Sequence, residues 1–123
     1  MGRLAPLEER RRRPVRFTYP TGTTETYTLI DEASTDTVRE SGAEYRYMIR
    51  LLEDANEERL IRMTCYRRPL GADESSWVFA GQTSITTGLE TWAGLFARAM
   101  ALDWFRALVE RVRGTISSRS VEG

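Results

Sequence analysis

A predicted helix over residues 89–113 constrains the fold more than any other feature, because its apolar face changes sides halfway along its length. In a helical projection, the two halves place their apolar residues on roughly opposite sides. The first half contributes Leu89, Trp92, Ala93, Phe96, Ala99 and Met100. The second half contributes Leu102, Phe105, Leu108, Val109 and Val112. A helix that packs on one sheet buries one face, so this helix needs two packing partners.

The second half has the residue spacing of a contact between two helices. A 3-4-3 spacing, as in the seam of a coiled coil, relates Leu102, Phe105, Val109 and Val112. A second copy of the chain is the simplest partner, so we expect a homodimer with these four residues in its interface. Two alternatives stay open. The second half could fold back onto residues 15–30 of the same chain, or the helix could bend near Gly94.

Five upstream segments have the pattern of β-strands. They are residues 15–19, 24–30, 43–53, 58–68 and 76–84. Residues 43–53 favour a strand over a helix because Tyr45, Tyr47 and Ile49 recur at every second position. Residues 31–42 are polar without an apolar face, which predicts a loop. Short connections favour antiparallel pairing between neighbours.

The expected fold class is therefore α+β. It has an antiparallel sheet of about five strands, with one long C-terminal helix that packs on one face and extends into a dimer contact. The chain has 123 residues, which fits a single domain over residues 15–113. We expect a flexible basic arm at residues 1–14 and a disordered tail at residues 114–123, because Gly114 suits the end of the helix.

The residue types present exclude most catalytic machinery. The chain has no histidine, which removes Ser-His-Asp and Cys-His catalysis and metal sites based on histidine. We interpret Cys65 as a small buried hydrophobic residue, and the acidic residues within 53–58 as a solvated turn. We expect no enzymatic activity, no catalytic residue, no cofactor and no metal. No segment is apolar enough to cross a membrane, and a single cysteine fits a cytoplasmic location.

One face of the predicted sheet combines aromatic and arginine side chains. If the helix covers the aliphatic face, the other face presents Arg46, Arg50, Arg62, Tyr66, Trp77 and Phe79. Exposed aromatic rings bind unpaired bases by stacking, and arginine contacts phosphates. The arm would add phosphate contacts from Arg11, Arg12 and Arg13. The alternative is that these aromatic residues are buried as part of the core.

The aromatic and arginine set, the strand order and the helix with two apolar faces resemble the ThermoDBP-like archaeal single-stranded-DNA-binding proteins. The resemblance covers about residues 15–113 at the level of pattern. It implies a small sheet with a helix on one side, dimerisation through helical elements and an aromatic-rich cleft for unpaired DNA. All 18 basic residues are arginine, and Asn56 and Gln82 are the only side-chain amides. Scarce amides are typical of thermophile proteins.

The sequence thus predicts sequence-tolerant binding of single-stranded nucleic acid, with DNA favoured over RNA. The bases would stack on Trp77, Phe79 and Tyr66. The alternative function is a protein–protein interaction or assembly module without nucleic acid binding, since an exposed apolar patch serves a protein partner equally well. In both cases the expected partners include a second copy of the chain and exclude a membrane.

Overall fold

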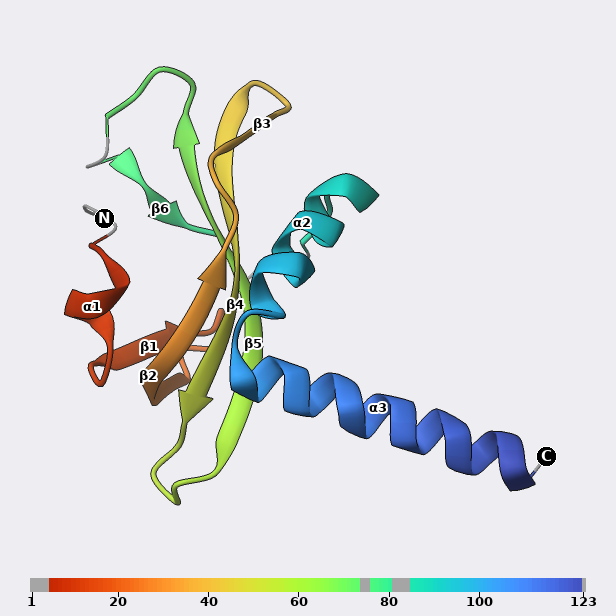
Figure 1. The fold of residues 1–123 in the computed structure, drawn as a ribbon. Helices are drawn as coiled ribbons and strands as arrows, with labels where there is room; N and C mark the ends of the chain where they lie inside the picture. Colours follow the sequence, from red (N-terminus) through yellow and green to blue (C-terminus); the bar gives the residue numbers. More distant parts are fainter. Residues whose placement is uncertain (1–4, 74–75, 81–84, 123) are drawn as a thin grey trace.

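The computed structural model describes residues 5–73, 76–80 and 85–122, and it has an α+β fold (Figure 1). Within these residues, the strands are β1 (Pro14–Thr18), β2 (Thr24–Ser34), β3 (Val38–Glu40), β4 (Ala43–Glu53), β5 (Arg59–Pro69) and β6 (Val78–Phe79). The helices are α1 (Leu7–Arg10), α2 (Leu89–Ala99) and α3 (Asp103–Glu122). The predicted α+β fold class with an antiparallel sheet is confirmed.

Strand β4 organises the sheet, whose order is β1-β2-β4-β5-β6. It pairs with β5 along its whole length, from Ala43 opposite Pro69 to Glu53 opposite Arg59. Its other edge pairs first with β3 and then with β2. The predicted loop at residues 31–42 is therefore wrong, because this polar segment continues β2 to Ser34 and then forms β3. Of the predicted strand at 76–84, only Val78–Phe79 form a strand, β6; residues 76, 77 and 80 are not part of it, and residues 81–84 lie outside the described part.

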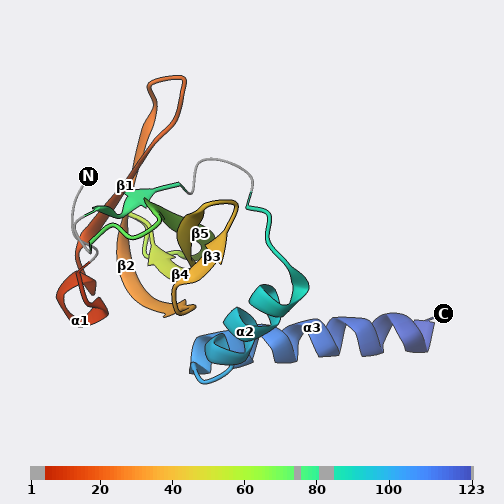
Figure 2. The same ribbon diagram turned by 90° about the horizontal axis from the view of Figure 1, so that it is seen from above.

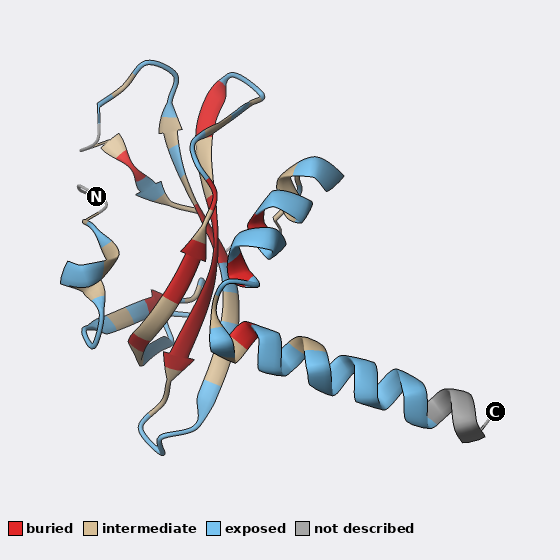
Figure 3. Ribbon diagram, viewed as in Figure 1, coloured by how far each residue is buried: buried red, intermediate tan, exposed pale blue. Residues whose placement is uncertain are grey.

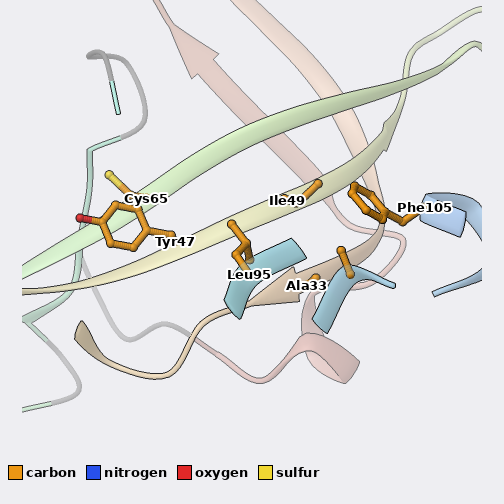
Figure 4. Packing of buried hydrophobic residues seen from close by; sticks show 7 residues of the cluster. Ala33, Tyr47, Ile49, Cys65, Leu95 and Phe105 are labelled. Atoms are coloured by element: carbon orange, nitrogen blue, oxygen red, sulfur yellow. The ribbon is translucent and has the colours of Figure 1, made fainter. Parts of the chain in front are cut away.

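Helix α2 and the start of α3 cover one face of the sheet (Figure 2). The buried core on this side comprises Ala33, Tyr47, Ile49, Cys65, Leu95, Ala99 and Phe105. Figure 4 shows Leu95 and Phe105 approaching Tyr47 and Ile49 from the helices. As the sequence predicted, the alternation along β4 places Tyr47 and Ile49 on the same face of the sheet.

The opposite face of the sheet is covered by the sheet itself. The strands curl so that β6 comes close to β1 (Figure 2), and Phe17 on β1 lies 5.8 Å from Phe79 on β6, measured between ring centroids. Phe17, Leu29 and Leu52 form a second buried cluster there. The N-terminal β1–β2 hairpin therefore closes over residues of β4 and β5 that would otherwise face solvent.

The predicted single helix over residues 89–113 is wrong, because the chain turns at residues 100–102 between α2 and α3. Backbone N–H groups of Ala101 and Leu102 bond to carbonyl groups three residues back, which tightens the chain at this point. The turn lets Leu95 and Phe105, which lie on opposite apolar faces, reach the same sheet face. The turn thus lets a single chain bury apolar residues from both faces of the predicted helix.

Both predicted flexible ends differ from the structure. In the arm, α1 packs on the second cluster through Leu7, and the backbone N–H of Arg12 donates to the Leu29 carbonyl at 2.7 Å. At the other end, α3 passes through Gly114 and continues to Glu122, projecting away from the sheet (Figure 1). In the part of the chain that the structure describes, none of the helices has the length and apolar character needed to cross a bilayer.

Candidate functional site

Five of the residues predicted to bind nucleic acid, Arg46, Arg50, Arg62, Tyr66 and Phe79, do share one face of the sheet. Arg50 lies opposite Arg62, Arg46 lies opposite Tyr66, and Tyr66 lies opposite Phe79 in the paired strands. Tyr66 and Phe79 also make an edge-to-face contact, with 5.6 Å between ring centroids. Sequence periodicity therefore identified the shared face correctly.

This face is not the exposed stacking surface that the sequence predicted. Trp77 and Arg50 are each 2 % exposed, so neither can meet a base or a phosphate without unfolding of its surroundings. The β1–β2 hairpin also brings Phe17 onto this face, where the guanidinium of Arg62 lies 3.7 Å from the centre of the Phe17 ring. The alternative of burial is the correct one for Trp77, and Arg50, which was expected to be exposed, is buried as well.

Arg50 belongs to a buried cluster of charges. Its Nε lies 3.8 Å from Glu32 Oε1, and its Nη2 donates to the hydroxyl of Tyr66 at 3.0 Å. Arg10 from the arm donates to the second carboxylate oxygen of Glu32. Trp77 also contacts an arginine, since the guanidinium of Arg68 lies over its ring, 4.3 Å from the ring centroid. These contacts give both residues a structural role.

The remaining predicted nucleic-acid residues keep some exposure. Arg46, Arg62, Tyr66 and Phe79 are half-buried. In the arm, Arg12 and Arg13 are exposed, whereas Arg11 pairs with Asp31 at 3.1 Å. Binding of single-stranded nucleic acid through these residues stays a prediction, but without Trp77 and Arg50 the stacking surface has lost its largest ring and one of its three arginines.

An apolar groove lies between α2 and α3. Its volume is about 510 Å³, and only apolar residues line it: Phe96, Met100, Phe105, Leu108, Val109 and Val112. The groove forms because α2 and α3 diverge from the turn at residues 100–102 (Figure 1). Phe96 and Phe105 stack at its base, with ring centroids 6.0 Å apart and planes 16° apart.

The residues predicted for a dimer seam line or flank this groove. Phe105 is buried against the sheet, and Leu102 and Val109 are half-buried. Beyond them the apolar row on α3 is open to solvent (Figure 3): Leu108 is 39 %, Val112 is 50 % and Ile116 is 59 % exposed. Of the four predicted seam residues, only Val112 is therefore exposed, and the uncovered row also includes Leu108 and Ile116.

Two contributors to this surface were missed by sequence reasoning. Ile116 was assigned to a disordered tail, although it lies four residues after Val112 and so continues the seam spacing. The α2 side of the groove, Phe96 and Met100, was assigned to the sheet-covering face, because a continuous helix was assumed. The spacing of Ile116 was a usable signal, whereas the contribution of α2 depends on the turn.

The described residues include no group of three or more acidic or cysteine side chains placed to hold a metal ion. No family model, curated protein or solved structure matches the chain. The functional interpretation therefore depends on the geometry of the surfaces themselves.

Proposed function

We propose that this protein is a self-assembly module, in which α3 of one copy packs into the α2–α3 groove of a second copy. The observation that carries the proposal is the uncovered apolar row of Leu108, Val112 and Ile116 beside a groove with an entirely apolar lining. Exposed apolar surface of this kind marks interaction sites. An isolated helix that projects into water has little stability of its own, so α3 gains most from a packing partner.

A second copy fits the groove better than an unrelated partner for two reasons. Each copy supplies both a groove and an apolar helix, so a two-fold arrangement covers both rows with one set of contacts. The chain has 18 basic and 18 acidic residues, so two copies carry no net charge to repel each other. At 20 residues, α3 is about 30 Å long, enough for a helix–helix contact over several turns.

The expected strength of the association follows from the exposed side chains. Full burial of a valine, leucine or isoleucine contributes about 1.5–3 kcal/mol. Since Leu108, Val112 and Ile116 are already partly covered, each contributes on the order of 1 kcal/mol, or roughly 6 kcal/mol for a symmetric pair of copies. Association costs about 4–15 kcal/mol in lost translational and rotational freedom, so this gain is consistent with at most a weak, reversible association that depends on protein concentration.

The test is the molar mass in solution, measured by light scattering or sedimentation over a range of concentrations. The wild type should move from monomer to dimer or a larger oligomer as concentration rises. Val112→Glu should remain monomeric, because association would bury the new carboxylate in an apolar groove. Ala107→Glu is the matched control, since Ala107 is exposed and lies about 140° from Val112 around the helix.

The control should associate as the wild type does, and at a concentration at which the wild type is monomeric all three proteins should have the same far-ultraviolet circular dichroism. A wild type that stays monomeric at the highest attainable concentration would refute the proposal. So would equal association of the Val112→Glu and Ala107→Glu variants.

A further inference from the structure

A second cavity lies on the helix-covered side of the sheet, away from the α2–α3 groove. Its volume is about 240 Å³, and its lining includes Glu40, Tyr45, Tyr47, Cys65 and Arg67. Tyr45 and Tyr47 come from β4, and their cross-strand partners on β5 are Arg67 and Cys65 respectively. The register of β4 and β5 therefore brings a basic and two aromatic side chains to one cavity, and β3 adds the acidic side chain of Glu40.

Glu40 is fixed at the cavity by the turn that follows it. Ser41 and Gly42 both have positive φ, 49° and 77°, as a two-residue hairpin turn requires, and this turn sets Glu40 opposite Ala43. The hydroxyl of Tyr47 donates to Glu40 Oε1 at 2.8 Å, and the hydroxyl of Thr87 lies 2.8 and 2.9 Å from the two carboxylate oxygens. Burial, and then the bond to Glu40, raise the pKa of Tyr47, so it stays a hydroxyl donor at neutral pH.

The charge of Glu40 is not neutralised by these hydroxyl groups. No arginine among the residues that the structure describes lies within ion-pair distance of its carboxylate. A carboxylate offers about four acceptor positions, so it keeps capacity for a cationic donor beside the two hydroxyls. Its rigid placement makes it a ready partner for an ammonium group.

Arg67 supplies the opposite charge at the same cavity. Its Nε donates to the hydroxyl of Tyr45 at 3.3 Å, which anchors the guanidinium through a neutral partner. Within the described ranges it has no acidic partner, and it does not pair with Glu40. The cavity thus presents one unpaired anion and one unpaired cation that are too far apart to neutralise each other.

We propose that this cavity binds a small zwitterion of the α-amino acid class. The ligand's ammonium group would pair with Glu40 and its carboxylate with Arg67, while the stacked rings of Tyr45 and Tyr47, 5.8 Å apart and inclined by 15°, form an apolar wall. A ligand with both charges satisfies both groups, whereas a simple amine or carboxylic acid satisfies one and leaves the other unpaired. This site does not depend on self-assembly.

The size of the cavity limits the ligand. A volume of about 240 Å³ equals the space of roughly eight water molecules in the liquid, so a ligand of about that many heavy atoms fits. It is smaller than the range of about 300–1,000 Å³ that is typical of sites for drug-sized molecules. Small neutral amino acids fit this limit, and nucleotides exceed it.

The experiment is a titration followed by two-dimensional NMR, in which each small neutral L-amino acid is added in turn to the full chain. We expect at least one of them to shift the resonances of Tyr45, Tyr47 and Cys65 in a saturable way. Ethylamine and propionate, which are alanine without its carboxylate and without its amine, should each bind at least about tenfold more weakly.

Two variants identify the charged partners. Glu40→Gln keeps an oxygen that accepts the hydroxyl donors but removes the charge, and Arg67→Gln removes the other charge at an exposed position. Each should weaken binding of the amino acid at least about tenfold, whereas Arg16→Gln, at an exposed position on β1, should leave it unchanged.

If Glu40→Gln lowers stability so far that it cannot be titrated, Arg67→Gln decides the question alone. The proposal is overturned if no amino acid shifts these resonances up to its solubility limit. It is also overturned if propionate or ethylamine binds as tightly as alanine, or if Arg67→Gln binds as the wild type does.

Discussion

Arg10, Glu32 and Arg50 form a cluster of charges, and removing one charge at a time should show how strongly the stability of the fold depends on each partner. Arg50 and Glu32 are both buried, and the guanidinium of Arg50 meets no other acidic group among the described residues. Glu32, in contrast, also pairs with Arg10, whose side chain reaches solvent. The two partners are therefore not equivalent, and neutralising each should have a different cost.

The magnitudes follow from what each substitution leaves behind. Glu32→Gln leaves the Arg50 cation buried without a counter-charge, and breaking a buried pair in this way costs about 3–5 kcal/mol. Arg50→Met fills much of the same volume, leaves Glu32 paired with Arg10, and loses the hydrogen bond to Tyr66, so it should cost about 1–2 kcal/mol. The double variant should be more stable than Glu32→Gln alone, because it removes the unpaired cation.

The assay is equilibrium urea unfolding followed by circular dichroism at neutral pH. A Val112→Glu background keeps self-association from contributing to the measured free energy. Asp36→Asn is the matched control, since Asp36 also pairs with an arginine, Arg98 at 2.8 Å, but both side chains are exposed. It should change the free energy of unfolding by less than about 0.5 kcal/mol.

The reasoning fails if Arg50→Met costs as much as Glu32→Gln, or if the effects of the two substitutions add in the double variant. Either result would mean that Glu32 does not neutralise Arg50 in the folded protein. A loss of more than about 1 kcal/mol in Asp36→Asn would show that the exposed pair is also structural, and would remove the contrast on which the magnitudes depend.

Two further predictions use the same unfolding assay. Trp77→Ala should lower the free energy of unfolding by about 3–5 kcal/mol, because Trp77 is buried; an unchanged urea midpoint with weaker binding of a single-stranded oligonucleotide would instead indicate a stacking role. Burial raises the pKa of the Cys65 thiol above its ordinary value of 9.0, so the folded state favours the neutral thiol. This contribution is fully present below pH 9.0 and is lost as the pH rises towards the folded-state pKa, so the urea midpoint should fall there by less in Cys65→Ala than in the wild type.

The sequence predicted the strands whose pattern is local and missed those whose pattern is set by distant contacts. Alternation along 43–53 gave the bounds of β4 without error, because one face of that strand meets the helices. Residues 31–42 were predicted as a loop because they are polar. In the folded chain Glu32 and Thr35 are nevertheless buried, Glu32 by its arginine partners and Thr35 by a bond from the Tyr47 backbone. Polar residues are usually exposed, but Glu32 and Thr35 are buried because each has a polar partner from a distant part of the chain.

The same limit explains the error about the aromatic face. Its membership follows from a period of two, so Arg46, Arg62 and Tyr66 were placed together correctly. Its exposure depends on the β1–β2 hairpin, and the contact of Phe17 with Phe79 joins residues at opposite ends of the sheet order. A local sequence pattern does not predict such a contact, because the contact arises from curvature that accumulates over the whole sheet.

The chain's own fold buries only part of the two apolar faces predicted for residues 89–113. The change of side predicted two packing surfaces, and the structure shows the first of them, which Leu95 and Phe105 share because of the turn at residues 100–102. A turn can redirect only the residues next to it, however, and α3 continues for four further turns. Val112 and Ile116 therefore continue the seam spacing, with Leu108 exposed one turn before Val112, and all three lie where the chain's own sheet does not cover them. A partner helix is the one packing surface that matches this row in length and spacing, which is why we expect the exposed row to be buried by self-assembly.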